Sequence, residues 1–388
     1  MRKISILGIG ETKMGRLAER SLRDLIQEAG NKAIVDAGIE KKEIDALYVG
    51  NFNSSYLCGQ GHMGSLASEA LELGNIPTVR TEGACASGSL AFRMAVMGIQ
   101  SGTYDIALVG GVEKMTHRNT ATVTTAIASA MDYELEAMQG FTFPASFAMI
   151  AHRYFHEYRD VKREMGMCAY NAHQNALLNP DAQMHKDVTL EKILAADLIA
   201  SPLSLFDCSL VTDGAAFVVL AAADAARGLR AKHRTIELAG SGHAGDTLAL
   251  ASKPVITSFA ATKAAAAQAY FQANLKPQDI DFAEVHDCFT ITQIINTEDL
   301  GFFEKGKGGD AVAEGITALK GKKPINPSGG LKAKGHPIGA TGLSQIYEVV
   351  TQLRGDAAKR QLAKADIGLA HNLGGTAGTC VINIFRGQ

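Results

Sequence analysis

The stretch RTEGACASGS, residues 80–89, places a cysteine among very small residues. Cys85 follows an extended segment, IPTVRTE, and precedes a stretch of helical character that begins at about Ser87. A cysteine at a helix N-terminus meets unpaired backbone N–H groups and the positive end of the helix dipole, which lower its pKa. Small neighbours would let a carbonyl group approach the sulfur and those N–H groups. Cys85 is therefore a candidate nucleophile, although these residues alone fit a small buried cysteine equally well.

The stretch AEVHDCFT places a histidine and a second cysteine directly after an apolar run, Ile280–Val285, that predicts a strand. His286 and Cys288 are two residues apart, so in an extended segment both side chains point to the same side. A packed strand end is the plain alternative, and a zinc site is weak because no second ligand pair follows. A general acid/base or an oxyanion donor is the better functional interpretation of His286.

The third stretch, NPSGGLKAKGHPIGATG, holds a histidine between a glycine and a proline. His336 follows two lysines and a glycine in a segment dense in glycine, namely Lys332, Lys334 and Gly335. These residues suit a loop beside a phosphorylated ligand, so we expect them to contact substrate. The segment is not a Walker loop, because no Gly-Lys-Ser/Thr follows, and a turn with an incidental histidine is the alternative.

The fourth stretch, AHNLGGTAGT, places His371 at the end of a late strand, with Gly374 and Gly375 just beyond it. A glycine-rich strand connection would explain it equally well. Together, however, the four stretches supply a thiol nucleophile, another cysteine and three histidines. Carbon–carbon bond chemistry through a thioester needs this set: a thiolate, its base, a proton shuttle and oxyanion donors.

A duplication in the chain predicts how these residues are positioned. A helix over SLRDLIQEAGNKAIVDAG, capped by Ser21 and ended by Gly38, precedes the strand-like IDALYVGN; FAATKAAAAQAYFQAN precedes IDFAEVHD in the same order. Likewise YDIALVGG matches ADIGLAHN, each after a helix. Two related halves that alternate helix and strand indicate a layered α/β fold with mainly parallel strands. Sites in such sheets lie beyond the carboxyl ends of the strands, where all four stretches fall.

The region from about 116 to 204 is less regular and interrupts the first repeat. We interpret it as an inserted loop domain within an N-terminal half of residues 1–245, followed by a C-terminal half of residues 246–388. The N-terminal GIGETKMG is a poor dinucleotide fingerprint, since its third glycine is misplaced. A nicotinamide-dependent dehydrogenase is therefore a weak alternative.

Composition excludes several classes of protein. The 388 residues carry a formal net charge of −2 with no long run of one sign, which argues against nucleic-acid or membrane-surface binding. No apolar stretch is long enough to span a bilayer, and the apolar run near the start is too short for a signal peptide. Six cysteines without a CxxC pair indicate neither a disulfide framework nor structural zinc. We therefore expect a cytoplasmic protein without a bound metal.

These motifs resemble those of the thiolases over essentially the whole chain. GACASG resembles the nucleophile motif, GGVEKMT the stretch that usually follows, and GHPIGATG the histidine loop of that family. The resemblance implies a thiolase fold: two duplicated βαβαβαββ halves, each with a five-stranded sheet, in a five-layered αβαβα core with an inserted loop domain. It implies acyl transfer between a 3-oxoacyl-CoA and CoA, a reversible Claisen condensation, with CoA as substrate and no tightly bound cofactor.

Two departures refine the resemblance. Most degradative and biosynthetic thiolases carry Asn-Glu-Ala-Phe where this chain has HDCF, residues 286–289, and Cys-x-Gly-Gly-Gly where it has HNLGG, residues 371–375. Both are similar to the sterol-carrier-protein-X type and to archaeal acetoacetyl-CoA thiolases, and the stand-alone archaeal form is the nearer match. That group implies a homodimer or tetramer and a small accessory protein with an OB fold and a zinc ribbon.

By this resemblance, Cys85 forms an acyl-enzyme and His336 takes the thiol proton. His286 and His336 would donate to the thioester oxygen of the leaving enolate, and backbone N–H groups of Cys85 and the 373–375 turn would hold the other oxyanion. The remaining acid is Cys288, with His371 positioning it or the substrate; the opposite assignment stays open.

Three alternatives to an acetoacetyl-CoA thiolase also stay open. A related subunit could take a bulkier substrate such as benzoylsuccinyl-CoA. A decarboxylating ketoacyl synthase shares the fold and would release CO2 from a malonyl donor. A thiolase-like scaffold subunit without catalytic activity would leave Cys85 inert.

Overall fold

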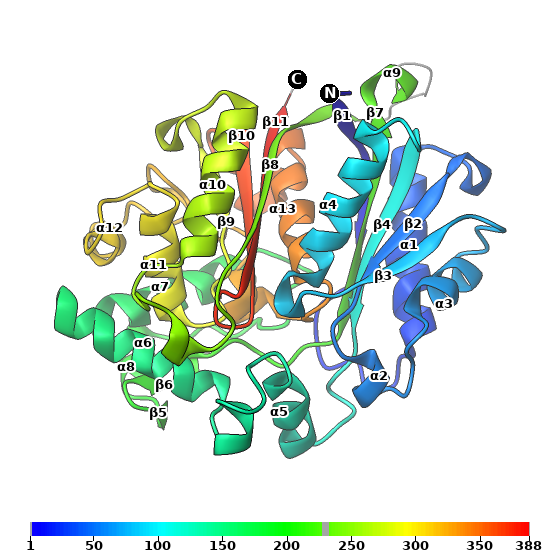
Figure 1. The fold of residues 1–388 in the computed structure, drawn as a ribbon. Coiled ribbons are helices and arrows are strands. Elements are labelled where there is room, and N and C mark those ends of the chain that lie inside the picture. Colours follow the sequence, from blue (N-terminus) through cyan, green and yellow to red (C-terminus); the bar gives the residue numbers. More distant parts are fainter. Residues whose placement is uncertain (1, 227–232, 388) are drawn as a thin grey trace.

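The described residues, 2–226 and 233–387 of a computed structural model, form a layered α/β molecule around one large sheet (Figure 1). The strand order in this nine-stranded sheet is β3-β2-β4-β7-β1-β8-β11-β10-β9. These strands span Ile4–Glu11 (β1), Ala46–Gly50 (β2), Thr78–Thr81 (β3), Ile106–Glu113 (β4), Gly214–Ala222 (β7), Ile236–Gly245 (β8), Phe282–Glu284 (β9), Ile367–Gly374 (β10) and Thr379–Gly387 (β11).

The predicted duplication is visible in this order. Strands β2 and β4 are parallel neighbours in the first half, and their counterparts β9 and β10 are parallel neighbours in the second. The first half supplies five strands, but the second supplies four within this sheet. Where a fifth strand was expected beside β9, the described residues form an isolated bridge between Ala283 and Ile325.

The two half-sheets meet at β1 and β8, where only Ser5 and Ile6 of β1 pair with β8. Strand β8 pairs with β11 from Ile236 to Gly245. We therefore propose that the second half begins before β8, at about residue 236, and not after residue 245.

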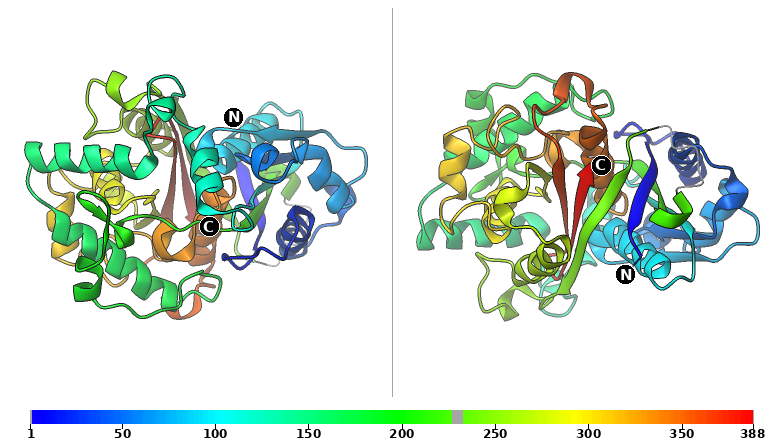
Figure 2. Two further views of the ribbon diagram at one scale, coloured as in Figure 1. Left: turned by 90° about the horizontal axis from the view of Figure 1, so that it is seen from below. Right: turned by 90° about the horizontal axis from the view of Figure 1, so that it is seen from above.

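Helices complete the layers. They span Leu22–Ala37 (α1), Ser54–Leu57 (α2), Met63–Ala70 (α3), Ser87–Gln100 (α4), Ala223–Ala226 (α9), Ala260–Ala273 (α10), Thr290–Asp299 (α11), Gly308–Ala313 (α12) and Thr341–Arg354 (α13). Helices α4 and α13 lie between the half-sheets, while α1 and α10 cover the two outer faces (Figure 2, right). The result is the expected αβαβα arrangement.

Strand β7 shows why the layers form. Alternate residues of a strand face opposite sides. Val218 and Leu220 therefore pack into the central core with α4 and α13, while Phe217 and Val219 pack against α1. A strand buried on both faces reads as one continuous apolar run, as AAFVVLAA does.

The ends of α1 follow directly from sequence. The hydroxyl of Ser21 accepts from the backbone N–H of Asp24, whose carboxylate accepts from the N–H of Ser21 in return, a capping box. Gly38 ends the helix at φ 70°, a conformation that glycine adopts without strain. The glycines of GIGETKMG, meanwhile, let α1 approach β1: a Cβ on Gly10 would lie 2.3 Å from the carbonyl oxygen of Ala29. They serve packing in this structure.

Between β4 and β7 the chain forms helices and a hairpin that cover one edge of the sheet, at the bottom of Figure 1. These elements are Thr120–Ala128 (α5), Phe143–Glu157 (α6), Lys162–Leu177 (α7), Leu190–Leu194 (α8), Leu198–Ala200 (β5) and Leu203–Ser204 (β6). The β10–β11 turn and the start of α4 lie at the same edge (Figure 1). No helix among the described residues is both long and apolar enough to cross a bilayer.

Candidate active site

Cys85 lies in a sharp turn between β3 and α4, within a short 3-10 segment, Ala84–Ala86. Ala84 has φ 50°, a left-handed conformation that costs a non-glycine residue about 1–3 kcal/mol. The turn is held by Ser87, whose hydroxyl accepts from the N–H of Gly83 (3.0 Å) and donates to the carbonyl of Ala84 (2.6 Å). The backbone is thus fixed on both sides of the thiol.

Two glycines around Cys85 also serve packing. A Cβ on Gly88 would lie 2.8 Å from the carbonyl oxygen of Gly339, and a Cβ on Gly374 would lie 2.3 Å from that of Gly83. Gly88 and Gly374 therefore let the 336–342 loop and the β10–β11 turn pack backbone to backbone around Cys85. Close approach of a substrate carbonyl is not needed to explain them.

The expectation of a lowered thiol pKa is wrong for the resting site. Burial raises the pKa of Cys85 to about 12, although hydrogen bonds from the backbone N–H groups of Gly375 and Cys85 oppose the rise. The helix N-terminus does not compensate for the loss of water. Cys85 is therefore held as a thiol and requires a base to ionise it.

An apolar cavity of about 170 Å³, partly open to solvent, lies in front of Cys85. Its wall includes Cys288, His336 and Gly375, so the structure brings residues from three of the predicted stretches to one space with Cys85. The rest is mainly apolar and aromatic, including Phe52, Met115, Ile127, Phe143, Phe147, Phe289 and Ile338.

His336 is held through its main chain and one ring nitrogen. Its backbone N–H donates to Thr212 Oγ1 (2.9 Å), and its Nδ1 lies 2.6 Å from Thr341 Oγ1. Because the Thr341 hydroxyl donates to the carbonyl of Pro337 (3.1 Å), its oxygen can accept a hydrogen bond from Nδ1–H. Nε2 is then unprotonated, and burial lowers the pKa of His336 to about 3. This imidazole is a neutral base.

His286 has its backbone and Nδ1 engaged. Its N–H donates to Nδ1 of His371 (3.3 Å), and its carbonyl accepts from Thr292 Oγ1 and Asn296 Nδ2 (2.9 Å each). Its Nδ1 lies 3.0 Å from Nδ2 of Asn372. Nε2 is therefore the nitrogen left for the reacting groups. Burial and the adjacent His336 and His371 lower the pKa of His286, so the ring is neutral.

His371 lies behind the reacting groups. It is fully buried, is not among the residues that line the cavity, and its Nε2 contacts Thr262 Oγ1 at 3.1 Å. Burial lowers its pKa to about 3. In this position Nδ1 of His371 holds the backbone N–H of His286, so we expect His371 to act as a positioning residue.

Cys288 does line the cavity, and its Sγ lies 4.0 Å from Thr292 Oγ1. Burial raises the pKa of its thiol well above the usual range, and the nearby Cys85 adds to the rise. Cys288 is thus a protonated thiol close to Cys85.

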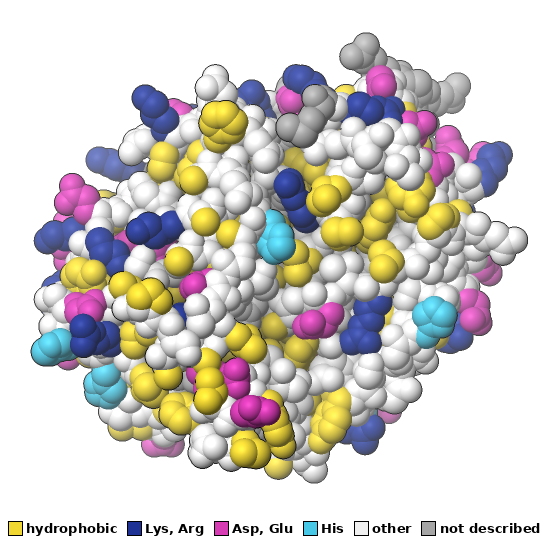
Figure 3. Space-filling model, in the orientation of Figure 1, with side chains coloured by type: hydrophobic (Ala, Val, Ile, Leu, Met, Phe, Trp, Pro, Cys, Tyr) yellow, Lys and Arg dark blue, Asp and Glu magenta, His cyan; other side chains and the backbone are white. Residues whose placement is uncertain are grey.

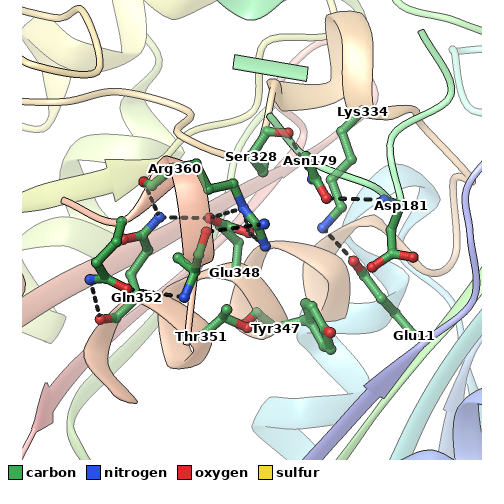
Figure 4. A network of polar contacts seen from close by, with 12 residues as sticks. Glu11, Asn179, Asp181, Ser328, Lys334, Tyr347, Glu348, Thr351, Gln352 and Arg360 are labelled. Carbon is green, nitrogen blue, oxygen red and sulfur yellow. Dashed lines mark hydrogen bonds and ion pairs between the residues drawn. The ribbon is translucent and has the colours of Figure 1, made fainter. Parts of the chain in front are cut away.

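Lys332, Lys334 and Gly335 are not placed to bind substrate, contrary to expectation. Lys334 is 3 % exposed and pairs with buried Glu11 at 2.9 Å (Figure 4). Lys332, also 3 % exposed, donates to the carbonyl of Cys208 (2.6 Å). Gly335 has φ 133°, and a Cβ there would lie 2.8 Å from Thr212. Glycine-rich spacing could not reveal that Gly330–Lys334 is a buried π-helix.

Sequence reasoning missed Glu113, which follows the apolar run of β4. Its buried carboxylate accepts from the N–H groups of Phe52 (2.8 Å), Asn53 (3.2 Å) and Gly339 (3.0 Å). It therefore ties the histidine loop to the end of β2. An acidic residue at the end of a fully apolar strand was the available signal. Thr341 and Asn372 were missed as well, because only the folded chain brings them to the histidines.

The reacting atoms form a compact group. The Sγ of Cys85 and one ring nitrogen each of His286 and His336 lie within 4.8 Å of one another. The rings of the two histidines meet edge to face. A thiol, a neutral base and a neutral N–H donor in an apolar cavity, with two backbone N–H groups at the sulfur, can support nucleophilic attack on a carbonyl.

Comparison with known proteins identifies the family. The family model described as "Thiolase, N-terminal domain" matches residues 4–224, and "Thiolase C-terminal domain-like" matches residues 242–387. The chain belongs to the thiolase family, which confirms the resemblance seen in its motifs, the thiolase fold and the prediction of an acyltransferase.

Individual relatives agree. An acetyl-CoA acetyltransferase of Methanothermobacter thermautotrophicus is 47 % identical over 99 % of this chain and 100 % of the relative. Sterol carrier protein 2 of Gallus gallus is 32 % identical over 99 % of this chain and 72 % of its own. Among solved structures, the Ltp2-ChsH2(DUF35) aldolase is similar with a TM-score of 0.84 and 25 % identity, over 98 % of this chain and 97 % of the other.

Proposed function

We propose that this chain is an acetyl-CoA C-acetyltransferase that interconverts acetoacetyl-CoA plus CoA with two acetyl-CoA through an acyl-enzyme on Cys85. One observation carries the proposal: the thiol of Cys85 and ring nitrogens of His286 and His336 lie within 4.8 Å of one another beside an apolar cavity. The similarity of the whole chain to the archaeal acetyltransferase supports the choice of substrate.

In the cleavage direction, the sulfur of Cys85 attacks the 3-oxo carbon as Nε2 of His336 takes the thiol proton. The backbone N–H groups of Cys85 and Gly375 hold the oxyanion that forms there. Collapse of this intermediate breaks the C2–C3 bond and leaves acetyl-CoA as an enolate. Its thioester oxygen accepts from Nε2–H of His286 and from the newly protonated His336. One such donor is typically worth about 3–4 kcal/mol.

The enolate carbon takes its proton from Cys288, which releases acetyl-CoA and leaves a thiolate. The thiol of the incoming CoA restores that proton, and the CoA sulfur attacks the acyl group on Cys85. The departing Cys85 sulfur recovers the proton held by His336. Every proton and bond is then accounted for, and no tightly bound cofactor is required.

Intact-mass measurement tests the proposal most directly. Incubation with acetoacetyl-CoA or acetyl-CoA should add one acetyl group to the wild-type chain, and Cys85→Ala should neither gain it nor catalyse thiolysis. Cys208→Ala is the matched control, because Cys208 lines the same cavity but is not part of the Cys85–His286–His336 group. Substantial thiolysis by Cys85→Ala, or an acyl group on another residue, would refute the proposal.

A bulkier substrate, such as benzoylsuccinyl-CoA, is the second candidate. The observation that favours it is the aromatic wall of the cavity, where the rings of Phe147 and Phe289 stack at 4.6 Å and Phe143 continues the stack at 6.4 Å. Thiolysis rates with acetoacetyl-CoA, longer 3-oxoacyl-CoAs and benzoylsuccinyl-CoA separate the two candidates. A higher kcat/KM for benzoylsuccinyl-CoA than for acetoacetyl-CoA would make the aromatic compound the preferred candidate substrate.

The proposal extends to assembly and location. We infer a homodimer or a dimer of dimers, and a small accessory protein of OB-fold and zinc-ribbon type, which the ChsH2(DUF35) component of a similar solved structure supports. A cytoplasmic location fits the six cysteines, all of them unpaired.

A further inference from the structure

We propose that Asn372 fixes the tautomer of His286, so that His286 presents Nε2–H to the enolate and the Cys85–His286–His336 group does not take up zinc. This inference rests on the proposed function for its catalytic half and is independent of that function for its zinc half. Asn372 acts through His286 and is a positioning residue.

The strand pattern explains how Asn372 reaches its place. Neighbouring residues of β10 point to opposite faces of the sheet. Leu369 and Leu373 pack on the α10 side of the sheet, as His371 does. Ala370 packs on the other side, in the central core with α4 and α13. Asn372 is two residues from Ala370 and therefore faces that core as well. His371 therefore holds the backbone of His286 from one side of β10, and Asn372 holds its ring from the other.

The orientation of the amide decides the tautomer. With Nδ2 directed at Nδ1 of His286, the amide donates, Nδ1 accepts, and the proton of the neutral ring is on Nε2. The amide oxygen is then the atom without a hydrogen-bond partner. The reversed amide would bury two N–H donors at that place instead, and unpaired donors are rarer in proteins than underused carbonyl oxygens.

The same bond opposes a metal ion. The ligand atoms of Cys85, His286 and His336 lie close enough together to hold one, and a thiolate with two imidazoles suits zinc. A histidine that binds through Nε2 must carry its proton on Nδ1 and give it to an acceptor, commonly a carboxylate. The NH2 group of Asn372 is a donor and cannot accept a hydrogen bond from Nδ1–H. Asn372 thus keeps these three side chains, which resemble a metal-binding site, available for the substrate.

The tautomer can be read directly in the unmodified protein. In a chain labelled with 15N-histidine, the His286 signals, assigned by their loss in His286→Gln, should show an unprotonated Nδ1 and a protonated Nε2 at pH 7.5. Protonation on Nδ1 would overturn the inference without involving activity. No variant of Asn372 has to fold for this measurement.

Zinc binding gives the second test. In Asn372→Asp a carboxylate replaces the donor, and Zn²⁺ affinity measured calorimetrically should rise about 10–100-fold over wild type, the usual range for outer-shell partners. The gain should vanish when Cys85→Ala is added. Asn383→Asp, a buried asparagine on β11 beside β10, is the matched control and should show no gain. Equal zinc affinity in wild type and Asn372→Asp would overturn the zinc half.

Partial reactions test the catalytic half. Asn372→Ala should slow exchange of the acetyl-CoA methyl protons with D2O at least tenfold, since that step needs the enolate. Exchange of labelled CoA into acetyl-CoA uses only the Cys85 acyl-enzyme and should slow far less. Equal loss of both reactions would mean a general structural defect and contradict the inference. Absence of both reactions from the wild type would instead refute the proposed function.

Discussion

The rings of His286 and His336 lie edge to face, with centroids 5.2 Å apart and planes inclined by 83°. Burial lowers the pKa of both histidines, so both rings are neutral before substrate binds. Two neighbouring neutral rings can divide the work, because Thr341 makes one a base and Asn372 makes the other a donor. When His336 takes the Cys85 proton, the new charge lies beside the place where the enolate forms.

Cys288 and His371 should differ when each is changed to alanine. Cys288→Ala should reduce turnover about 10²–10⁴-fold while acetyl-CoA still acylates Cys85, because only the proton donor to carbon is lost. His371→Ala should disturb His286 and reduce thiolysis less. Steady-state rates and intact mass report the two effects. If His371→Ala shows the large loss and Cys288→Ala stays near wild type, their roles are exchanged.

Lys334 should contribute to the stability of the fold and not to the binding of CoA. Lys334→Met leaves the buried Glu11 without its partner, and breaking such a pair costs about 3–5 kcal/mol of unfolding free energy. Urea unfolding measures this loss, and the KM for CoA should stay within twofold. Exposed Lys320 is the matched control, and Lys320→Met should change neither value. A tenfold rise in the KM for CoA with unchanged stability would show instead that Lys334 binds substrate.

His173 should contribute to acid sensitivity. It is buried on α7, and burial, with nearby Lys332, lowers its pKa to about 4. Below pH 6.5 the unfolded chain binds a proton that the folded histidine does not bind until about pH 4. Stability from this group is therefore full above pH 6.5 and falls by about 1.4 kcal/mol for each pH unit towards 4.

His173→Phe should accordingly flatten the pH dependence of the unfolding free energy between pH 4.5 and 6.5. Urea titrations at intervals of one pH unit measure it. His156→Leu, at an exposed position of α6, serves as the control and should leave the slope unchanged. An unchanged slope in His173→Phe would contradict the assignment.

The edge strand β3 should lie in a subunit interface. Val79 on β3 and Met94 and Met97 on α4 are 43 %, 45 % and 51 % exposed, and Figure 3 shows hydrophobic side chains over these elements. Light scattering should give a dimer or tetramer, and Val79→Lys with Met97→Glu should shift it towards monomer. Leu198→Glu, on the exposed β5, should not. A fully active wild-type monomer at micromolar concentration would contradict this.

Sequence alone predicted the elements whose signals are local. The cap at Ser21, the glycine after α1 and the matched order of helices and strands in both halves depend on neighbouring residues. It also predicted that Cys85, Cys288 and His336 lie at the same edge of the sheet. It failed for Lys334, whose partner Glu11 is more than 300 residues away. The sequence also did not predict that His371 lies outside the cavity wall, because this depends on which face of β10 other elements cover.

The backbone contact between Gly375 and Cys85 has a consequence for how this enzyme is made. Cys85 leaves the ribosome early, but Gly375, which completes its oxyanion site, lies in the turn between the last two strands. Almost 300 residues must be synthesised between these two parts, and contacts of such long range form slowly. A nascent chain therefore carries Cys85 without its complete oxyanion site until synthesis is nearly finished. We therefore expect acylation of Cys85 to require the completed chain.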